Sequence, residues 1–171
     1  MDFFAHFIAQ RAMLLERGIM VDVETAGPAL SRHALLSLGA NKISDPDNRF
    51  YVEFKPDKFE FVPEALAVTG FTLEGLSKTG EEPKQALSEF HAWSASIGIK
   101  KPLFTALGAC FDWKFYDYYA LHYVGDNPFG YFAFDTKSAF GGLVKRSPTP
   151  HHAGKDAYIQ TQDLLEFFKT F

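Results

Sequence analysis

The chain has 171 residues, of which 47% are hydrophobic and 22% are charged, and its formal net charge is −4. This length and composition predict a single globular domain with one sizeable core, and the acidic balance excludes a broad basic surface for duplex nucleic acid. A short substrate held locally by metal ions is compatible with this charge. The single cysteine excludes an internal disulfide and fits a reducing cytoplasm, where we expect the protein to work.

The first 18 residues contain an apolar run that is interrupted by charged side chains. Asp2 replaces the positive charge of a signal peptide, no small-residue cleavage site follows, and the run is too short to span a membrane. Several apolar side chains fit one helical stripe: Phe3, Phe4, Phe7, Ile8, Leu14 and Leu15. We predict a helical extension over residues 1–18 that docks on a domain of residues 19–171 or on a second subunit. Met20 is an equally suitable start of the compact domain.

Three strands are predicted next, followed by a short helix. The strands cover residues 18–24, 33–43 and 49–56, with a turn at 45–48, and they predict an antiparallel meander. The helix begins at Pro63, a residue suited to a first helical turn.

The rest of the chain alternates helix and strand. Ala86, Phe90, Trp93 and Ile97 share a face of an amphipathic helix that Gly98 ends. The later elements are a strand at 102–108, an aromatic helix at 110–125, a strand or turn leading to a short helix at 131–143, a basic loop at 144–150 and a closing helix at 151–171. This order predicts an α/β fold with a mixed sheet and helices on both faces.

Two carboxylates stand on alternate positions of the first strand. Asp22 and Glu24 therefore point the same way, and in a partly buried setting they repel each other by roughly several kcal/mol at an effective dielectric near 20. A divalent cation converts that repulsion into coordination, because hard cations such as Mg²⁺ prefer carboxylate oxygens. The alternative is a strand end at which both groups are solvated.

A third acidic residue, Asp112, follows directly on the strand at 102–108. An Asp in a first helical turn often only complements the helix dipole. However, Phe111, Phe115 and Tyr119 are spaced to bury one side of this helix, which holds Asp112 near a strand end, where α/β sites tend to lie. Asp117, five residues on, points elsewhere and is predicted to be a solvated surface residue.

The third polar cluster lies at residues 151–157. A histidine beside a metal-bound water can take its proton, and His151 precedes a helix that carries Asp156. The preceding basic loop would let the histidine swing in once substrate is bound. His152 is a competing candidate, and a solvated histidine pair at a helix start is the alternative to both.

Three segments in chain order, VDVET, FDWKF and HHAGKDA, resemble the motifs of the DEDDh 3′–5′ exonuclease superfamily. That superfamily includes ribonuclease T, oligoribonuclease and the proofreading subunit of bacterial replicative polymerase. The matched residues are Asp22, Glu24 and Thr25 in the first motif, Phe111, Asp112 and Phe115 in the second, and His151, Ala153, Asp156 and Ala157 in the third. The match selects His151 over His152, and it favours the histidine type because His152 stands where the tyrosine type has its tyrosine.

The resemblance covers residues 19–170, and the layout looks most like small standalone exoribonucleases. It implies an RNase H-like fold and a phosphodiesterase with two divalent ions, Mg²⁺ or Mn²⁺. Asp22 would bridge both ions, Glu24 and Asp156 would bind one, Asp112 would bind the other, and His151 would deprotonate the attacking water. Gly108 departs from the family, because many relatives carry there an Asn that helps to hold substrate.

The implied substrate is a single-stranded 3′ end, with RNA slightly favoured over DNA. Candidate walls for the terminal base are Thr25, Phe71 and Trp113, although core packing is the alternative for both aromatic rings. Lys145, Arg146 and Lys155 are candidate phosphate contacts or parts of a solvated loop. The other functions considered are a DNA repair or proofreading exonuclease and a non-catalytic nucleic-acid-binding domain. A homodimer is expected because several relatives dimerise, and no membrane contact is expected.

Overall fold

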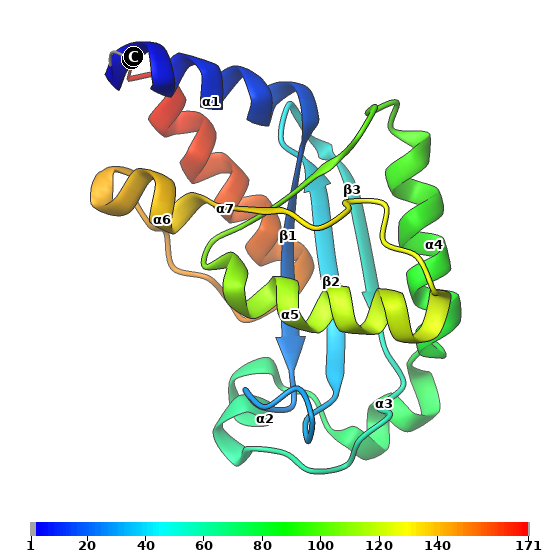
Figure 1. The fold of residues 1–171 in the computed structure, drawn as a ribbon. Helices are drawn as coiled ribbons and strands as arrows, with labels where there is room; N and C mark the ends of the chain where they lie inside the picture. The colour runs from blue at the N-terminus through cyan, green and yellow to red at the C-terminus, as the bar shows by residue number, and fades with distance from the viewer. Residues whose placement is uncertain (1–2, 171) are drawn as a thin grey trace.

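The computed structural model describes residues 3–170, and its centre is a five-stranded sheet in the order β3-β2-β1-β4-β5, of which Figure 1 shows β1, β2 and β3 side by side. The strands are β1 (Gly18–Thr25), β2 (Leu35–Lys42), β3 (Asp45–Glu53), β4 (Leu103–Ala106) and β5 (Ala133–Asp135). The first three pair antiparallel, whereas β4 runs parallel to β1 and β5 runs parallel to β4. The predicted mixed sheet with an antiparallel meander at its start is confirmed.

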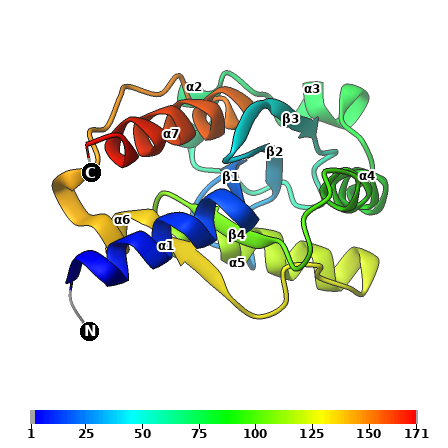
Figure 2. The same cartoon turned by 90° about the horizontal axis from the view of Figure 1, so that it is seen from above.

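Helices cover both faces of this sheet, as Figure 2 shows with α7 on one side and α5 on the other. They are α1 (Phe3–Arg17), α2 (Pro63–Thr69), α3 (Leu73–Thr79), α4 (Pro83–Ser96), α5 (Ala109–Tyr119), α6 (Thr136–Phe140) and α7 (Ala153–Phe168). Residues 1, 2 and 171, which the sequence placed in the first and last helices, lie outside the described residues. Among residues 3–170, no helix combines the length and the apolar character needed to cross a membrane.

The alternation of side chains along β1 divides the core in two. Ile19, Val21 and Val23 face α4 and α5, where Phe90 and Phe115 are fully buried. On the opposite face Met20 packs with residues of α1 and α7. Full burial of such side chains contributes about 1.5–3 kcal/mol each, so both faces of β1 are strongly held. Asp22 and Glu24 fall on the face of Met20, which is covered by α7.

The N-terminal helix docks on its own domain. The Phe7 ring lies 5.5 Å from that of Phe167 and 6.1 Å from that of Phe140, and Leu14 is completely buried in the same cluster. Phe4 and Ile8, on the same helix, are 51% and 47% exposed. Docking on a second subunit stays a prediction.

The turn predicted at residues 45–48 is wrong. Ile43 and Ser44 connect β2 to β3, since Lys42 already pairs with Asp45. The next pair joins Asn41 to Arg49, so residues 46–48 form a bulge in β3. Pro46 is tolerated there because β3 is an edge strand and a bulge needs no complete ladder.

Two helical details also differ from the sequence prediction. Helix α3 was not predicted, although Thr72 caps it by accepting a hydrogen bond from the Gly75 amide at 3.0 Å. The aromatic helix ends at Gly125 as predicted, but its last turn, Ala120–Val124, is a π-helix. Phe111 was expected to be buried and is 36% exposed, because the first turn of α5 borders a cleft and not the sheet.

Gly39 brings α7 onto the sheet at the position opposite Asp22. Gly39 pairs with Asp22 across β1 and β2, so both face α7. A Cβ atom at residue 39 would lie 2.2 Å from the carbonyl carbon of Ala153 and from the amide nitrogen of Gly154. Only glycine therefore allows the first turn of α7 to lie directly on β2.

We predict that Gly39→Ala destabilises the protein by about 1–3 kcal/mol or more, because the added methyl overpacks a backbone contact. Urea unfolding followed by circular dichroism measures the change. Gly142→Ala is the control, since residue 142 has open space around its Cβ position. Equal unfolding midpoints for the two variants would contradict this account of α7 docking.

Candidate active site

The carboxylates of β1 lie where the neighbouring strand on one side has already ended. β4 pairs only with Gly18–Met20 and stops at Ala106, so the later part of β1 borders open space on that side. A register shift between Glu24 and Thr25 adds an irregularity at the same point, a common feature beside functional sites. Asp22 and Glu24 are both partly exposed to this space.

Helix α5 supplies the third carboxylate. Asp112 is only 6% exposed, and its Oδ1 accepts a hydrogen bond from the Val23 amide at 3.1 Å. Asp112 thus binds to the unpaired edge of β1 in addition to standing in the first turn of its helix. Gly108 precedes the helix with φ +92°, and its amide donates to Asp135 Oδ1 at 3.1 Å. Gly108, which departs from the family pattern, therefore fixes the loop before α5 through its backbone amide.

Helix α7 supplies the fourth carboxylate and a neutral partner for the first. Asp156 is 3% exposed, and its Oδ1 is buried without a hydrogen-bond partner. One turn later, Gln160 Nε2 donates to Asp22 Oδ1 at 2.7 Å. Sequence reasoning missed Gln160, although its spacing of four residues from Asp156 puts both on one helix face.

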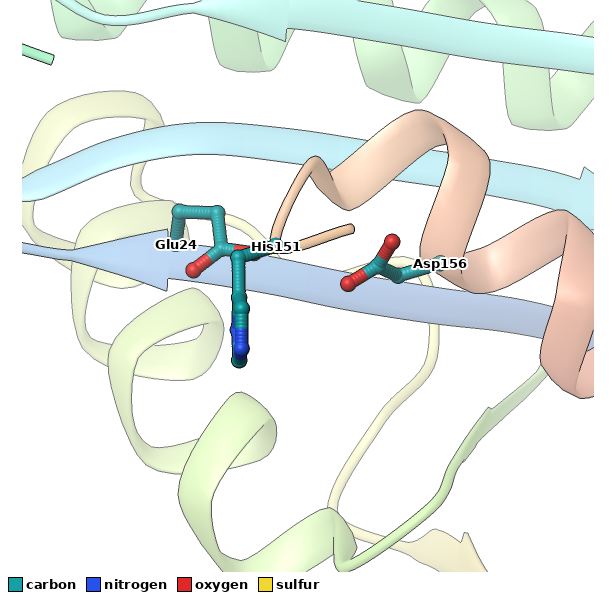
Figure 3. A group of neighbouring side chains, drawn as sticks. All are labelled: Glu24, His151 and Asp156. Carbon is teal, nitrogen blue, oxygen red and sulfur yellow. The ribbon is translucent and has the colours of Figure 1, made fainter. Parts of the chain in front are cut away.

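The structure separates the two histidines. His151 is exposed, has φ +55°, and presents a ring nitrogen within 4.8 Å of oxygens of both Glu24 and Asp156 (Figure 3). His152 instead stacks on Tyr51 with 4.5 Å between ring centroids. His151 therefore lies with the carboxylates, and His152 anchors the start of α7 to β3.

All five predicted catalytic residues line one cleft of about 430 Å³: Asp22, Glu24, Asp112, His151 and Asp156. Lys137 and Arg146 also line it, whereas Lys145 and Lys155 do not. The loop before His151 is fixed at Ser147, whose amide and hydroxyl each donate to the Asp163 carboxylate at 2.7 Å. The loop that was predicted to let His151 swing in is thus restrained at this point.

The predicted base-contacting residues are spread over three places. Thr25 lines a second recess of about 240 Å³ beside the cleft, together with Val68 and Phe111. Trp113 packs edge-on against Phe104, with 5.1 Å between ring centroids, and Phe71 packs against a cluster beneath α2 and α3. Neither ring lines the cleft. Phe111 lines both the cleft and the recess, and the sequence had assigned it to the core.

Burial and mutual repulsion disturb the acidity of these carboxylates. Burial raises the pKa of Asp22 to about 7, opposed by the Gln160 hydrogen bond and reinforced by the charge of Asp156. Burial, with the charges of Asp22 and Asp156, raises the pKa of Glu24 to about 8. The pKa values of Asp112 and Asp156 are raised above their usual range, chiefly by burial.

The donor set fits divalent cations. Oxygen ligands from four carboxylates are what Mg²⁺ and Mn²⁺ prefer, and the unpartnered Oδ1 of Asp156 is available to bind one. Among the described residues, Glu24, His151 and Asp156 form a group close enough to hold a single ion. Cation binding would also displace the protons that the raised pKa values retain near neutral pH.

The metal-free protein is predicted to lose stability as pH rises from 5 to 8. Asp22 and Glu24 bind protons more tightly in the folded chain than in the unfolded one, where their pKa values are 3.8 and 4.5. Their contribution to stability is therefore full below pH 4 and is lost as pH passes through about 7 and 8. Thermal melting in a chelating buffer measures the fall.

Asp22→Asn removes one of the titrating groups and should reduce this fall, so that the variant is more stable than the parent at pH 8. Glu74→Gln is the matched control, since the side chain of Glu74 is 83% exposed. If the melting temperature of Asp22→Asn falls with pH as steeply as that of the parent, the raised pKa of Asp22 does not contribute to the loss of stability.

Comparisons with known proteins show the family and the fold of the chain. No protein-family model matches the chain. The chain is 40% identical over 132 residues to the 3′-5′ DNA exonuclease Cap18 of Escherichia coli, and the alignment covers 75% of this chain and 70% of Cap18.

Solved structures of other proteins share the fold, among them the two that follow. S. pombe Pop2p, in a form with Mg²⁺ and Mn²⁺ bound, has a TM-score of 0.64 at 14% identity, over 98% of this chain and 89% of Pop2p. E. coli ExoI, in a zinc-bound complex with single-stranded DNA, has a TM-score of 0.68 at 16% identity, over 91% of this chain. The chain spans only 41% of that ExoI chain. At these identities the likeness is one of fold, and it confirms the RNase H-like architecture.

Proposed function

The chain belongs to the DEDD 3′–5′ exonuclease superfamily and is a 3′–5′ exonuclease, and we propose that it releases 5′-mononucleotides from single-stranded ends with two divalent cations. The observation that carries the proposal is the convergence of four carboxylates and His151 in one cleft. These residues come from β1, α5 and the start of α7, which are far apart in the sequence. A non-catalytic binding domain would have no need to keep them together.

The roles proposed for the residues follow from their positions. Asp22, whose charge acts on both Glu24 and Asp112 and which is influenced by Asp156, would hold both cations, with Glu24 and Asp156 on one and Asp112 on the other. When bound, the two cations supply the positive charge that phosphodiester hydrolysis requires. His151 is exposed beside Glu24 and Asp156, where it takes the proton of the attacking water.

We propose single-stranded DNA as the preferred polymer. The layout of the sequence slightly favours RNA, but the relative at 40% identity is named a DNA exonuclease. RNA remains the second candidate, on the strength of the resemblance to small exoribonucleases. The recess beside the cleft is apolar apart from Glu24 and Thr25, and the Thr25 hydroxyl donates to the Gly27 carbonyl oxygen at 3.0 Å. We expect base stacking there to dominate over recognition of a 2′-hydroxyl.

Two positively charged side chains line the same cleft as the carboxylates. Lys137 and Arg146 line it, and Lys137 follows Asp135, which accepts hydrogen bonds from the amides of residues 137 and 138. We propose that these two side chains contact phosphates of the strand, which positions the substrate without reading its sequence. This assignment replaces the earlier candidates Lys145 and Lys155.

Digestion of 5′-labelled DNA and RNA oligomers with Mg²⁺ or Mn²⁺ tests the activity. The parent protein should shorten single strands stepwise from the 3′ end, faster on DNA, and a chelator should stop it. His151→Ala should lower the rate by about 10²- to 10⁴-fold, the usual contribution of a general base, whereas His152→Ala should lose far less.

Asp22→Ala is the negative control, because activity that survives this substitution would come from a contaminant. No metal-dependent shortening of either polymer would support the non-catalytic alternative. Faster digestion of RNA would reverse the proposed preference, and equal losses in the two histidine variants would mean that His151 is not the base.

Phe111→Ala should raise the KM for single strands by roughly 5- to 100-fold, since base stacking on an aromatic ring contributes about 1–3 kcal/mol. The melting temperature should fall less than in Trp113→Ala, because Phe111 is 36% exposed. Trp113→Ala is the matched comparison, and it should lower the melting temperature because Trp113 packs on Phe104. An unchanged KM in Phe111→Ala would remove this ring from the substrate site.

A further inference from the structure

Gln160 is a buried amide in direct contact with the central carboxylate of the cleft. It is 9% exposed, and its Nε2 lies 2.7 Å from Asp22 Oδ1. The two residues are 138 positions apart in the chain, so the contact depends on the docking of α7 against β1. Its other polar atom, Oε1, is buried without a partner although Gln160 lines the cleft.

The chemistry of the pair fixes which way the amide faces. An ionised carboxylate can only accept hydrogen bonds, so Gln160 presents its NH₂ group to Asp22, and its Oε1 stays buried without a partner. The bond occupies one lone pair of Oδ1 and leaves the remaining lone pairs of Asp22 available for cations. A carboxylate without such a donor can rotate about its last torsion, which is broad.

We propose that Gln160 is a positioning residue that orients Asp22 for cation binding, an inference that rests on the proposed exonuclease function. Gln160 is neutral, so its hydrogen bond leaves the negative charge of Asp22 available to the cations. A lysine would neutralise Asp22, and a glutamate would add a further repulsive charge to the cleft.

The place of Gln160 on α7 suits it to orient Asp22. Asp156 and Gln160 are four residues apart on α7, so they stand on one face, one turn from each other. A single rigid element therefore sets both the ligand Asp156 and the orientation of the ligand Asp22. Mutation of a residue that hydrogen-bonds to a metal ligand in this way typically lowers metal affinity by about 10- to 100-fold.

The experiment compares Mn²⁺ binding by titration calorimetry in the parent, Gln160→Met and Thr161→Val, each without substrate. Methionine keeps the unbranched shape of glutamine and removes both polar atoms. We expect Gln160→Met to bind Mn²⁺ about 10- to 100-fold more weakly. The Mn²⁺ concentration for half-maximal exonuclease rate should rise by the same factor.

Thr161→Val is the matched control. Thr161 is fully buried on the same helix, and its Oγ1 accepts a hydrogen bond from Asn41 Nδ2 at 2.8 Å, away from Asp22. This variant should lower the melting temperature and leave Mn²⁺ affinity unchanged. Mn²⁺ affinity in Gln160→Met within twofold of the parent, or an equal loss in Thr161→Val, would overturn the proposal.

Gln160→Lys provides a second variant should Gln160→Met fold poorly. It keeps a donor to Asp22 but adds a positive charge, so it should fold and bind Mn²⁺ more weakly than the parent. Parent-like affinity in Gln160→Lys would refute the need for a neutral donor. Absence of Mn²⁺ binding in the parent itself would overturn the proposed function together with this inference.

Discussion

Mutual repulsion among carboxylates is the constraint on which the rest of the structure depends. Asp22, Glu24, Asp112 and Asp156 share one cleft, and within residues 3–170 no ion pair joins any of them to a lysine or arginine. Their raised pKa values express the cost, because ionising each group is easier in the unfolded chain. An arrangement of this kind opposes folding unless packing elsewhere holds it and a cation relieves it.

The fold supports these groups with neutral dipoles. β4 ends early, which leaves the Val23 amide free to bind Asp112, and α7 lies so close to Gly39 that Gln160 reaches Asp22. Each donor orients a carboxylate without cancelling its charge. The hydrophobic clusters on the two faces of β1 hold the elements that carry these donors. Core packing therefore acts directly on the geometry of the site.

The sequence predicted what depends on local pattern and missed what depends on long-range contact. Alternation in β1, the order of three motifs and the position of His151 were readable, and the structure brings the five motif residues into one cleft. Phe71 was predicted to contact the terminal base and packs beside α2 and α3, whereas Phe111 was predicted in the core and lines the cleft. The position of α5 relative to the cleft decides which ring is exposed there. Gln160 carries no motif, since its partner is 138 residues away. The bulge at residues 46–48 was missed because Pro46 resembles a turn signal.

His151 is exposed whereas Asp112 and Asp156 are buried, and the anchoring of the segment before α7 explains this difference. Ser147 is held by Asp163, and His152 is held by its stack on Tyr51, so only residues 148–151 lie between two anchors. Two of those residues are prolines, whose fixed φ angles limit the backbone further. His151 itself has φ +55°, a strained value for a residue with a Cβ atom. The short anchored segment thus imposes this conformation, and it keeps an exposed imidazole in the same cleft as the buried Asp112 and Asp156.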